Sequence, residues 1–297
     1  MKIISGSGSP KLAKNISLQL NAPLIDCDID TFANGEKRIR VENSVKNEEV
    51  LLIQSFSKPK VDEKIIETTL IADSLERLGA KEVSLFIPWF GYSFQDKVFI
   101  PGEPLSAKVI ARIIESTRVK KVYLLDLHNT SIPGFFSIPT YHISAMNEFV
   151  KHIGKHFDLS NSIVVSPDFG GIKRARMFAN ELNLDMASVE KRRDLRTGQV
   201  TTTKLDGDVK DKTVFIFDDA ILSGQTVVEV AKLIKEKGAK EIHFLATHGV
   251  FTGDAIKSLE ESMVDSVTIT NSIERPEQYP KITVLDISKV LVDNLQG

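Results

Sequence analysis

Two adjacent acidic residues, Asp218 and Asp219, follow the unbroken apolar run 214–217. Such a run of β-favouring residues is typical of a strand that is buried on both faces of a parallel sheet. A loop of small and polar residues, 223–226, comes next, and after it apolar residues recur at helical spacing as far as Gly238. Glycine at that place is expected to end a helix. The sequence therefore predicts a strand, a loop and a helix in that order.

A loop rich in hydroxyl groups and glycine that leads into a helix is suited to bind phosphate. Its N–H groups and the positive end of the helix dipole point into one concavity. Two adjacent carboxylates would repel a phosphate, so we expect Asp218 and Asp219 to face ribose hydroxyls or a divalent cation. The alternative is an ordinary strand–turn–helix whose aspartates are solvated.

Other polar residues also follow predicted strands. Asp126 and His128 come after the strand 121–125, and Asp168 comes after the strand 162–165. In a doubly wound α/β sheet the carboxyl ends of the strands share one crevice, where ligands bind. A histidine and several aspartates at that edge are best explained by a hydrated Mg²⁺ and a phosphorylated ligand. Cysteine is absent from these positions, so the pattern does not favour zinc.

The composition of the 297-residue chain is that of a globular protein. Apolar residues make up 42% and charged residues 26%, and the formal net charge is −2. The chain is long enough for two domains of ordinary size, and its charge favours neither a nucleic-acid nor a membrane partner. The single cysteine, Cys27, excludes an intrachain disulfide and fits a reducing compartment. We expect a soluble cytoplasmic protein without a membrane span or signal peptide.

The elements that must position these residues follow from periodicity. Apolar runs and helical spacing predict strands at 2–4, 38–41, 50–54, 83–87, 121–125 and 162–165, and helices at about 11–21, 61–78 and 145–157. Asn34-Gly35 indicates a turn, and taken alone it is more often a plain turn than a site. The charged stretch 188–203 lacks either periodicity and is interpreted as a mobile loop, with a solvated charge run as the alternative.

One short string occurs twice. The residues GAKE stand at 79–82 and again at 238–241, each time after a predicted helix and before an apolar strand. A separation of 159 residues is too long for a solenoid repeat and indicates duplication of a whole domain. Two similar α/β domains are expected.

The stretch DDAILSGQT at 218–226 resembles the 5-phosphoribosyl diphosphate (PRPP) motif of the type I phosphoribosyltransferase fold. In that motif the acidic pair contacts the ribose hydroxyls and the loop holds the 5-phosphate. Leu222 and Gln225 depart from the residues usual at their places, and Gln225 is expected to restrict the backbone where glycine is common.

The resemblance extends over nearly the whole chain. Segments in the order typical of ribose-phosphate diphosphokinases are FANGE, IPWFGYSFQDK, GEPLSAK, DLH, IPGFFSIP, VSPDFGG, EKRR and ATHGVFTG. It implies an α/β fold of two tandem type I phosphoribosyltransferase-like domains, each a mostly parallel sheet flanked by helices. We place the N-terminal domain at 1–144 and the C-terminal domain, with the PRPP motif, at 145–297, its last helix able to pack back on the N-terminal domain.

The family transfers the diphosphate of ATP to the 1-hydroxyl of ribose 5-phosphate in a Mg²⁺-dependent reaction that yields PRPP and AMP. The resemblance implies the following site residues: Lys191 and Arg193 for catalysis; Asn34, Gly35, Glu36, Phe94 and Gln95 for ATP; Arg193, Asp218, Asp219, Leu222, Ser223, Gly224, Gln225 and Thr226 for ribose 5-phosphate; His128 and Asp168 for the metal. Asp218 or Asp219 would orient the 1-hydroxyl or accept its proton, and both roles stay open.

The resemblance also implies a homo-oligomer, a dimer or larger, because the loop 32–36 of this family often reaches the ATP site of a neighbouring subunit. Phe94 stands where the family has arginine, and Phe169 replaces a common histidine. For Phe94 we expect either stacking on adenine or a loss of ATP affinity. Two other functions remain as alternatives: a non-catalytic regulatory homologue that binds nucleotide or an enzyme partner, and a phosphoribosyltransferase that consumes PRPP.

Overall fold

The computed structural model describes residues 1–42, 44–193, 200–275 and 278–296. The chain forms two compact units. The first comprises Met1–Ala145, Asn271–Glu274 and Asp286–Gly297, and the second comprises Met146–Thr270 and Arg275–Leu285. Within the described residues, no helix has the length and apolar character that crossing a membrane requires.

The first unit is built on a parallel sheet of six strands, in the order β2-β1-β5-β6-β7-β8. Its strands are β1 (Lys2–Ser5), β2 (Leu24–Ile25), β5 (Glu49–Ile53), β6 (Glu82–Ile87), β7 (Val119–Leu125) and β8 (Thr140–Ile143). Its helices are α1 (Pro10–Leu20), α2 (Val61–Arg77), α3 (Ser106–Glu115), the short 3₁₀ helix η1 (Ile132–Phe135) and α8 (Ser288–Gln296). The strands β3 (Cys27–Thr31) and β4 (Lys37–Val41) form a separate antiparallel hairpin.

The second unit has a sheet of seven strands, in the order β11-β10-β9-β12-β13-β14-β15, in which only β11 is antiparallel to its neighbour among the described strands. Its strands are β9 (Ser162–Ser166), β10 (Asp185–Arg193), β11 (Val200–Asp206), β12 (Thr213–Ile221), β13 (Glu241–Gly249), β14 (Ser266–Thr270) and β15 (Ile282–Leu285). Its helices are α4 (Met146–His156), α5 (Ile172–Leu182), α6 (Gln225–Glu236) and α7 (Ala255–Glu260).

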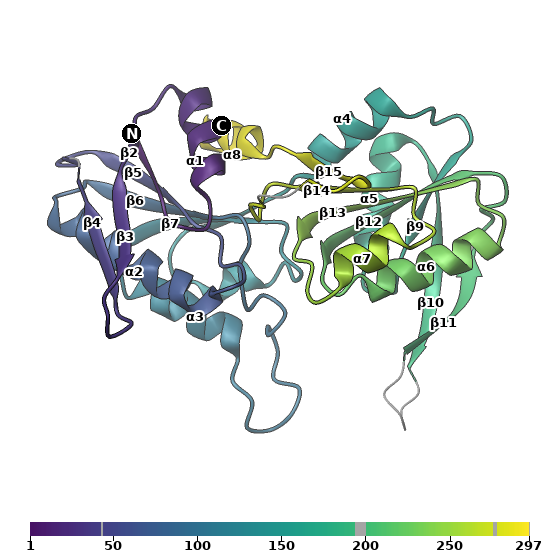
Figure 1. Cartoon of the computed structure of the whole chain (residues 1–297), viewed down its shortest axis with the longest axis horizontal. Coiled ribbons are helices and arrows are strands. Elements are labelled where there is room, and N and C mark those ends of the chain that lie inside the picture. Colours follow the sequence, from purple (N-terminus) through teal and green to yellow (C-terminus); the bar gives the residue numbers. More distant parts are fainter. Residues whose placement is uncertain (43, 194–199, 276–277, 297) are drawn as a thin grey trace. The chain divides into compact units, whose positions relative to one another are not determined.

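Each unit has three layers, with the sheet between two layers of helices (Figure 1). In the first unit α2 lies beside α3 and α1 lies beside α8; in the second, α6 lies beside α7 and α4 beside α5. The central strands are buried on both faces, as the continuous apolar runs predict: Leu51 and Leu52 of β5 and Phe215 and Ile216 of β12 are fully buried. The predicted fold class is confirmed.

The duplication is visible in the order of the strands. Six strands of the second unit, β10-β9-β12-β13-β14-β15, follow the same order and direction as the six of the first. The two GAKE turns also match in detail. Gly79 and Gly238 have φ values of 79° and 89°, and their carbonyls accept bonds from the N–H groups of Asn47 and Asp211 at 2.8 and 2.9 Å. The repeat in the sequence thus marks the same helix end in both units.

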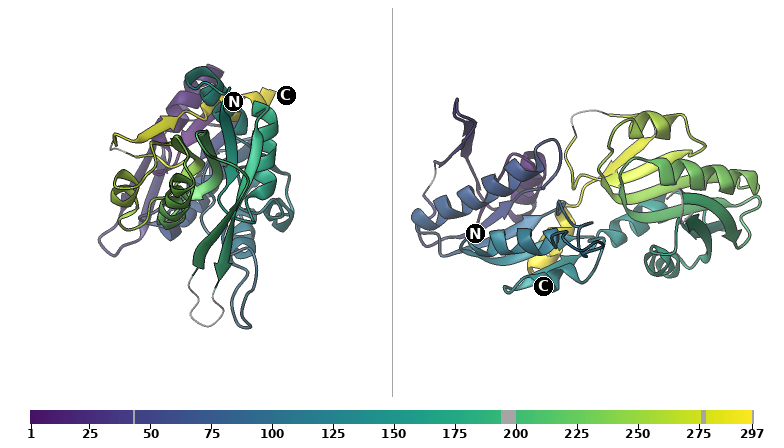
Figure 2. Two further views of the ribbon diagram at one scale, coloured as in Figure 1. Left: turned by 90° about the vertical axis from the view of Figure 1, so that its right-hand side faces the viewer. Right: turned by 90° about the horizontal axis from the view of Figure 1, so that it is seen from below.

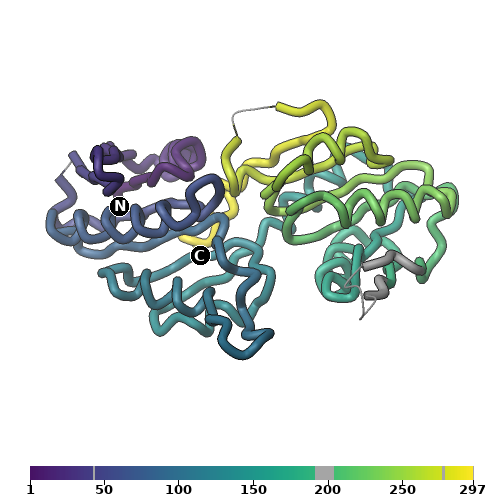
Figure 3. The backbone as a smooth tube through the Cα atoms, turned by 60° about the horizontal axis from the view of Figure 1, so that its bottom comes forward, coloured from purple at the N-terminus to yellow at the C-terminus, as the bar shows by residue number. Residues whose placement is uncertain are grey.

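The C-terminal segment returns to the first unit. Helix α8 packs on α1, and Gln19 Nε2 donates a hydrogen bond to Ser288 Oγ. Figure 1 shows the yellow α8 beside the purple α1, and in Figure 3 the C-terminus lies among elements of the first unit. The first unit therefore needs both ends of the polypeptide to complete its second helical layer.

The prediction for the charged stretch 188–203 was wrong. Most of it is a β-hairpin, since β10 runs to Arg193 and pairs with β11, and it extends from the sheet (Figure 1). Residues 194–199 lie outside the described part. A hairpin of charged and threonine residues has no apolar alternation, so periodicity could not reveal it.

A smaller correction concerns Asp218 and Asp219. They do not follow the strand but lie within it, because β12 continues to Ile221. Asp218 pairs with Ala246 and Ala220 with His248 of the equally long β13. The neighbouring strand prolongs the hydrogen bonding past the point where the apolar run ends.

The two matched turns lead to a prediction about stability. Alanine at Gly79 or Gly238 would have to adopt a left-handed backbone, which costs about 1–2 kcal/mol. We expect Gly79→Ala and Gly238→Ala each to lower the thermal midpoint of the unit that carries it, by about 2–4 °C per kcal/mol. The control is Gly154→Ala in α4, an exposed helical position where an added Cβ meets no atom within 4 Å; there the midpoint should rise. Calorimetry showing equal midpoints for all three variants would contradict this account.

Candidate active site

The acidic pair of β12 is bound to an arginine. Arg174 of α5 places Nη1 2.6 Å from Asp218 Oδ1 and 3.0 Å from Asp219 Oδ1. The N–H of Asp219 also donates to Asp218 Oδ1, at 2.9 Å. The side chains of Asp218 and Asp219 are only 16% and 7% exposed, so one guanidinium compensates two nearly buried carboxylates.

Burial is the main electrostatic influence on Asp218. Loss of solvation raises its pKa well above the usual range, and the neighbouring charge of Asp219 raises it further. Arg174 opposes this shift, while the more distant Asp168 adds to it. The net result is a carboxyl group that holds its proton more tightly than an ordinary aspartate.

Asp168 is held in a tight turn between β9 and α5. Its Oδ1 accepts a hydrogen bond from the N–H of Gly171 at 2.9 Å, and its carbonyl accepts one from Ser166 Oγ at 2.8 Å. A Cβ at Gly171 would come within 3.1 Å of Ser166 Oγ, so the close turn favours glycine. Phe169, next to it, is 88% exposed and leaves the carboxylate of Asp168 in place.

The predicted phosphate loop 222–226 lies where β12 passes into α6. Gly224 is the N-cap of α6 with φ 75°, so glycine suits the position. The segment that follows β13 holds the loop: the N–H of Thr252 donates to the carbonyl of Leu222, and the N–H groups of Val250 and Phe251 donate to that of Ile221. These bonds fix the start of α6.

Gln225, where we expect a more restricted backbone than with glycine, adopts no unusual conformation. It is the first residue of α6 and has an ordinary helical backbone. Its side chain bonds within the helix, from Nε2 to Glu229 Oε1 at 2.9 Å. Ser223, Gln225 and Glu229 border an open depression of about 470 Å³ on the side of α6 and α7.

In the first unit, His128 and Phe94 lie together. Their ring centroids are 4.5 Å apart, and the ring of Trp89 is 6.0 Å from that of Phe94 on another side. His128 is exposed and Phe94 half-buried. Phe94 therefore contacts one of the predicted metal ligands, which the sequence did not indicate.

The remaining predicted ATP residues occupy two places in the first unit. Gln95 is exposed, and its Oε1 accepts a bond from Ser106 Oγ at the start of α3, at 2.7 Å. Asn34, Gly35 and Glu36 form the exposed turn of the β3–β4 hairpin, which stands out from its unit in Figure 2 (right). Gly35 has φ 91°, and its N–H donates to the carbonyl of Phe32, so the Asn-Gly turn is confirmed.

Lys191 and Arg193 lie on β10 in the hairpin with β11. Lys191 pairs with Thr202 and Arg193 with Val200, and the register shifts between Glu190 and Lys191. Such a bulge bends the strand locally. The side chains of Lys191 and Arg193 lie outside the described part.

The described residues offer few candidate ligands for a metal ion. Among the described residues, no three His, Cys, Asp or Glu side chains are arranged to hold a metal ion. His128 belongs to the first unit and Asp168 to the second. A carboxylate oxygen suits Mg²⁺, which commonly keeps its waters and takes one or two carboxylates together with substrate phosphates. Asp168 fits such an ion, whereas the imidazole of His128 is a softer ligand.

The structure thus brings together Asp218, Asp219 and Arg174 at the carboxyl end of β12, beside the loop 222–226. Arg174 was missed as a site residue. Its signal in the sequence was the basic start of the helix after SPDFGG, which showed that cations were present but not which one meets the aspartates.

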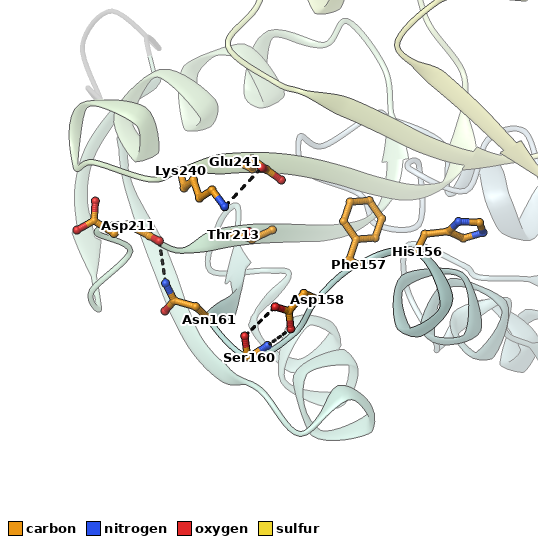
Figure 4. Close-up of a pocket in the computed structure, with 9 residues that line it drawn as sticks. All are labelled: His156, Phe157, Asp158, Ser160, Asn161, Asp211, Thr213, Lys240 and Glu241. Carbon is orange, nitrogen blue, oxygen red and sulfur yellow. Dashed lines mark hydrogen bonds and ion pairs between the residues drawn. The ribbon is translucent and has the colours of Figure 1, made fainter.

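Another depression, of about 260 Å³, lies at the opposite, amino ends of β12 and β13 (Figure 4). Its polar residues largely bond one another: Ser160 binds Asp158, and Asn161 Nδ2 donates to the carbonyl of Asp211. These lining residues bond largely to one another and lie at the opposite end of β12 from Asp218. We therefore assign this depression no role in the candidate site.

Comparison with known proteins agrees with this geometry. Residues 1–117 match the family described as the N-terminal domain of ribose phosphate pyrophosphokinase, and residues 195–296 match the phosphoribosyl synthetase-associated domain. The solved structure of phosphoribosylpyrophosphate synthetase from Mycobacterium smegmatis superposes with a TM-score of 0.91 at 30% identity, covering 99% of this chain and 97% of that chain.

Curated relatives match over nearly their whole length. The ribose-phosphate pyrophosphokinase of Campylobacter jejuni is 37% identical, over 98% of this chain and 94% of the relative. Ribose-phosphate pyrophosphokinase A of Dictyostelium discoideum is 35% identical, over 100% of this chain and 94% of the relative. The chain therefore belongs to the ribose-phosphate pyrophosphokinase family.

Proposed function

We propose that this protein transfers the diphosphate of ATP to the 1-hydroxyl of ribose 5-phosphate, giving PRPP and AMP. The observation that carries the proposal is the pair Asp218–Asp219, bound by Arg174 beside the loop 222–226 at the start of α6. The membership of the family and the survival of its motifs along the whole chain support the same reaction.

The second unit would bind ribose 5-phosphate. The 5-phosphate would lie against the loop formed by Leu222, Ser223, Gly224, Gln225 and Thr226, where N–H groups and the dipole of α6 favour an anion. Both Arg174 and the N–H of Asp219 contact the same oxygen, Oδ1, of Asp218. The acidic pair would then accept hydrogen bonds from ribose hydroxyls, which are donors that a carboxylate can fix in direction.

In the reaction, the oxygen of the 1-hydroxyl would form a bond to the β-phosphorus of ATP. The bond from that phosphorus to the bridging oxygen of the α-phosphate would break, and AMP would leave with this oxygen. The proton of the hydroxyl must pass to a base, and Asp218 in its ionised form would be a stronger base than an ordinary aspartate because its pKa is raised. Lys191 and Arg193 would neutralise charge that develops on the transferred group.

The first unit would contribute to ATP binding. Asn34, Gly35 and Glu36 on the exposed hairpin, together with Phe94 and Gln95, are the residues we assign to the nucleotide. Asp168 would hold Mg²⁺, with His128 as a further ligand, and the ion would neutralise phosphate charge when bound. We further propose a homo-oligomer, a dimer or larger, in which the hairpin of one subunit reaches the ATP site of another.

The raised pKa of Asp218 predicts how stability depends on pH. The protonated form is favoured in the folded protein, so the contribution of Asp218 to stability is present at low pH and is lost as the pH rises through the raised pKa. Asp218→Asn, which is neutral throughout, should unfold at a higher temperature than wild type at about pH 7.5 and lose this advantage near about pH 4. It should also lose activity.

The control is Asp158→Asn. Bonds from Ser160 lower the pKa of Asp158, so its substitution should lower the unfolding temperature at neutral pH instead. Thermal melts across this pH range that show no gain for Asp218→Asn would contradict the electrostatic description of the pair.

Phe94 yields a second prediction. If its ring stacks on adenine, Phe94→Leu should raise KM for ATP by about five-fold or more, since stacking of a base on an aromatic ring is worth about 1–3 kcal/mol. Phe94→Tyr keeps the ring and should have little effect. Steady-state kinetics should show KM for ribose 5-phosphate unchanged in both variants. Equal KM values for ATP in wild type and Phe94→Leu would remove Phe94 from the nucleotide site.

The reaction itself is tested by ³¹P NMR of the purified protein with Mg²⁺, ATP and ribose 5-phosphate. Wild type should form AMP and PRPP in equal amounts, and Lys191→Ala should be slower by about 10²–10³-fold, as for loss of a group that stabilises charge in the transition state. Lys204→Ala, an exposed lysine on β11 of the same hairpin, is the control and should retain activity. ATP that stays intact, or gives only ADP, would favour a regulatory homologue instead.

A further inference from the structure

A lysine next to the turn of the exposed hairpin connects it to helix α2. Lys37 opens β4 immediately after Glu36. Its Nζ is 3.1 Å from Glu63 Oε2 and 3.7 Å from Glu67 Oε2, and its side chain is only 14% exposed. A lysine so largely removed from water must gain from fixed partners, because its ammonium has lost most of its hydration.

The carboxylate of Glu67 is held in place by several hydrogen bonds. Its side chain is fully buried. Oε1 accepts bonds from the N–H of Ser7 and from Gln54 Nε2, both at 2.6 Å, and Oε2 accepts one from Ser7 Oγ at 2.9 Å. These bonds come from the ends of β1 and β5, so they tie the carboxylate to the central sheet. The buried charge is therefore fixed in position before Lys37 meets it.

The hairpin needs such a connection. It is a two-stranded sheet, and an isolated hairpin of this size is marginally stable in water. Its turn, residues 32–36, is exposed, while the half-buried Ile29 and Ile39 pack on the apolar core of the unit nearer the base. Lys37 lies between these two regions and is the first residue beyond the turn that contacts α2 through a charge.

We propose that Lys37 is a positioning residue, which clamps the turn Asn34–Gly35–Glu36 against α2 through Glu63 and the buried Glu67. The proposal rests on the assignment of this turn to ATP. Lys37 itself would not touch the nucleotide. It would reduce the number of directions that the turn can take and so lower the entropy lost when ATP binds.

Removal of the clamp should leave the fold intact. Lys64 also lies near Glu67, and its ammonium donates to the carbonyl and Oγ of Ser57. Together with the bonds from Ser7 and Gln54, this cation keeps Glu67 compensated when Lys37 is replaced. Lys37→Met retains the apolar stem of the side chain, so the packing of the hairpin base is preserved.

The reactivity of one thiol, that of Cys27, reports whether the hairpin is packed on the rest of its unit. Cys27, the single cysteine of the sequence, lies on β3 opposite Val41 of β4. Burial, followed by the charges of Glu67 and Asp28, raises the pKa of its thiol to about 11. A thiol with this pKa reacts slowly near neutral pH, and release of the hairpin would return it toward ordinary reactivity.

The experiment compares Lys37→Met with wild type by two measurements on the full chain. With the thiol reagent DTNB near neutral pH, Cys27 should react about five-fold faster or more, because local opening of the hairpin becomes easier. In steady-state kinetics, KM for ATP should rise by about three- to ten-fold while KM for ribose 5-phosphate changes by less than about two-fold, as expected for a misplaced binding loop.

Two further variants sharpen the comparison. Lys60→Met removes another lysine that pairs with Glu63, at 3.1 Å, but one that lies on the α2 side rather than on the hairpin. It should change neither quantity. Lys37→Arg keeps the positive charge and should restore most of the wild-type behaviour in both assays.

Unchanged thiol reactivity in Lys37→Met would overturn the clamp. Faster thiol reaction with an unchanged KM for ATP would overturn the positioning role. If wild type forms no PRPP at all, the proposed function fails, and the thiol assay alone then decides whether Lys37 holds the hairpin.

Discussion

Burial of two neighbouring carboxylates in one strand costs free energy unless a cation lies close enough to compensate their charge. Asp218 and Asp219 meet this condition through a single guanidinium, that of Arg174, and through a bond from the backbone of the strand itself. The arginine in turn depends on the short turn at Asp168 and Gly171, which starts α5 at the right place. The acidic pair, the turn and the helix form one electrostatic unit, and the phosphate loop begins three residues beyond it.

The duplication gives this arrangement a natural comparison within the chain. By strand order, β5 of the first unit corresponds to β12 of the second, and β1 corresponds to β9. Where β12 carries the acidic pair, β5 is followed directly by Gln54, whose amide donates a hydrogen bond to the buried carboxylate of Glu67. In the serine- and glycine-rich loop after β1, the N–H and the hydroxyl of Ser7 donate hydrogen bonds to that same carboxylate. One fold thus supports two arrangements: an end of the sheet where two carboxylates are held by an arginine, and an end where the loop binds an internal carboxylate.

The fold could be predicted because its dominant signals are local. Continuous apolar runs marked the central strands, helical spacing marked α1, α2 and α4, and the repeated GAKE marked equivalent helix ends. The candidate site was predicted where motif and position coincide, at Asp168, at Asp218 and Asp219, and at the loop 222–226. The hairpin β10–β11 escaped prediction because β10 is held by hydrogen bonds to β11 on one side and to β9 on the other, and such pairing does not appear as apolar periodicity.

By itself, the sequence determined the type of chemistry and the architecture that supports it, since residue types, their order and their spacing are properties of the chain alone. Tertiary structure decided which charges meet. That Arg174 rather than a neighbouring cation holds the acidic pair, that Phe94 contacts His128, and that Lys37 reaches a carboxylate buried under β1 and β5 all depend on contacts between elements that are distant in sequence. The assignment of the last helix to the first unit has the same origin: α1 offers a surface on which α8 packs, and that surface exists only once both ends of the chain are folded.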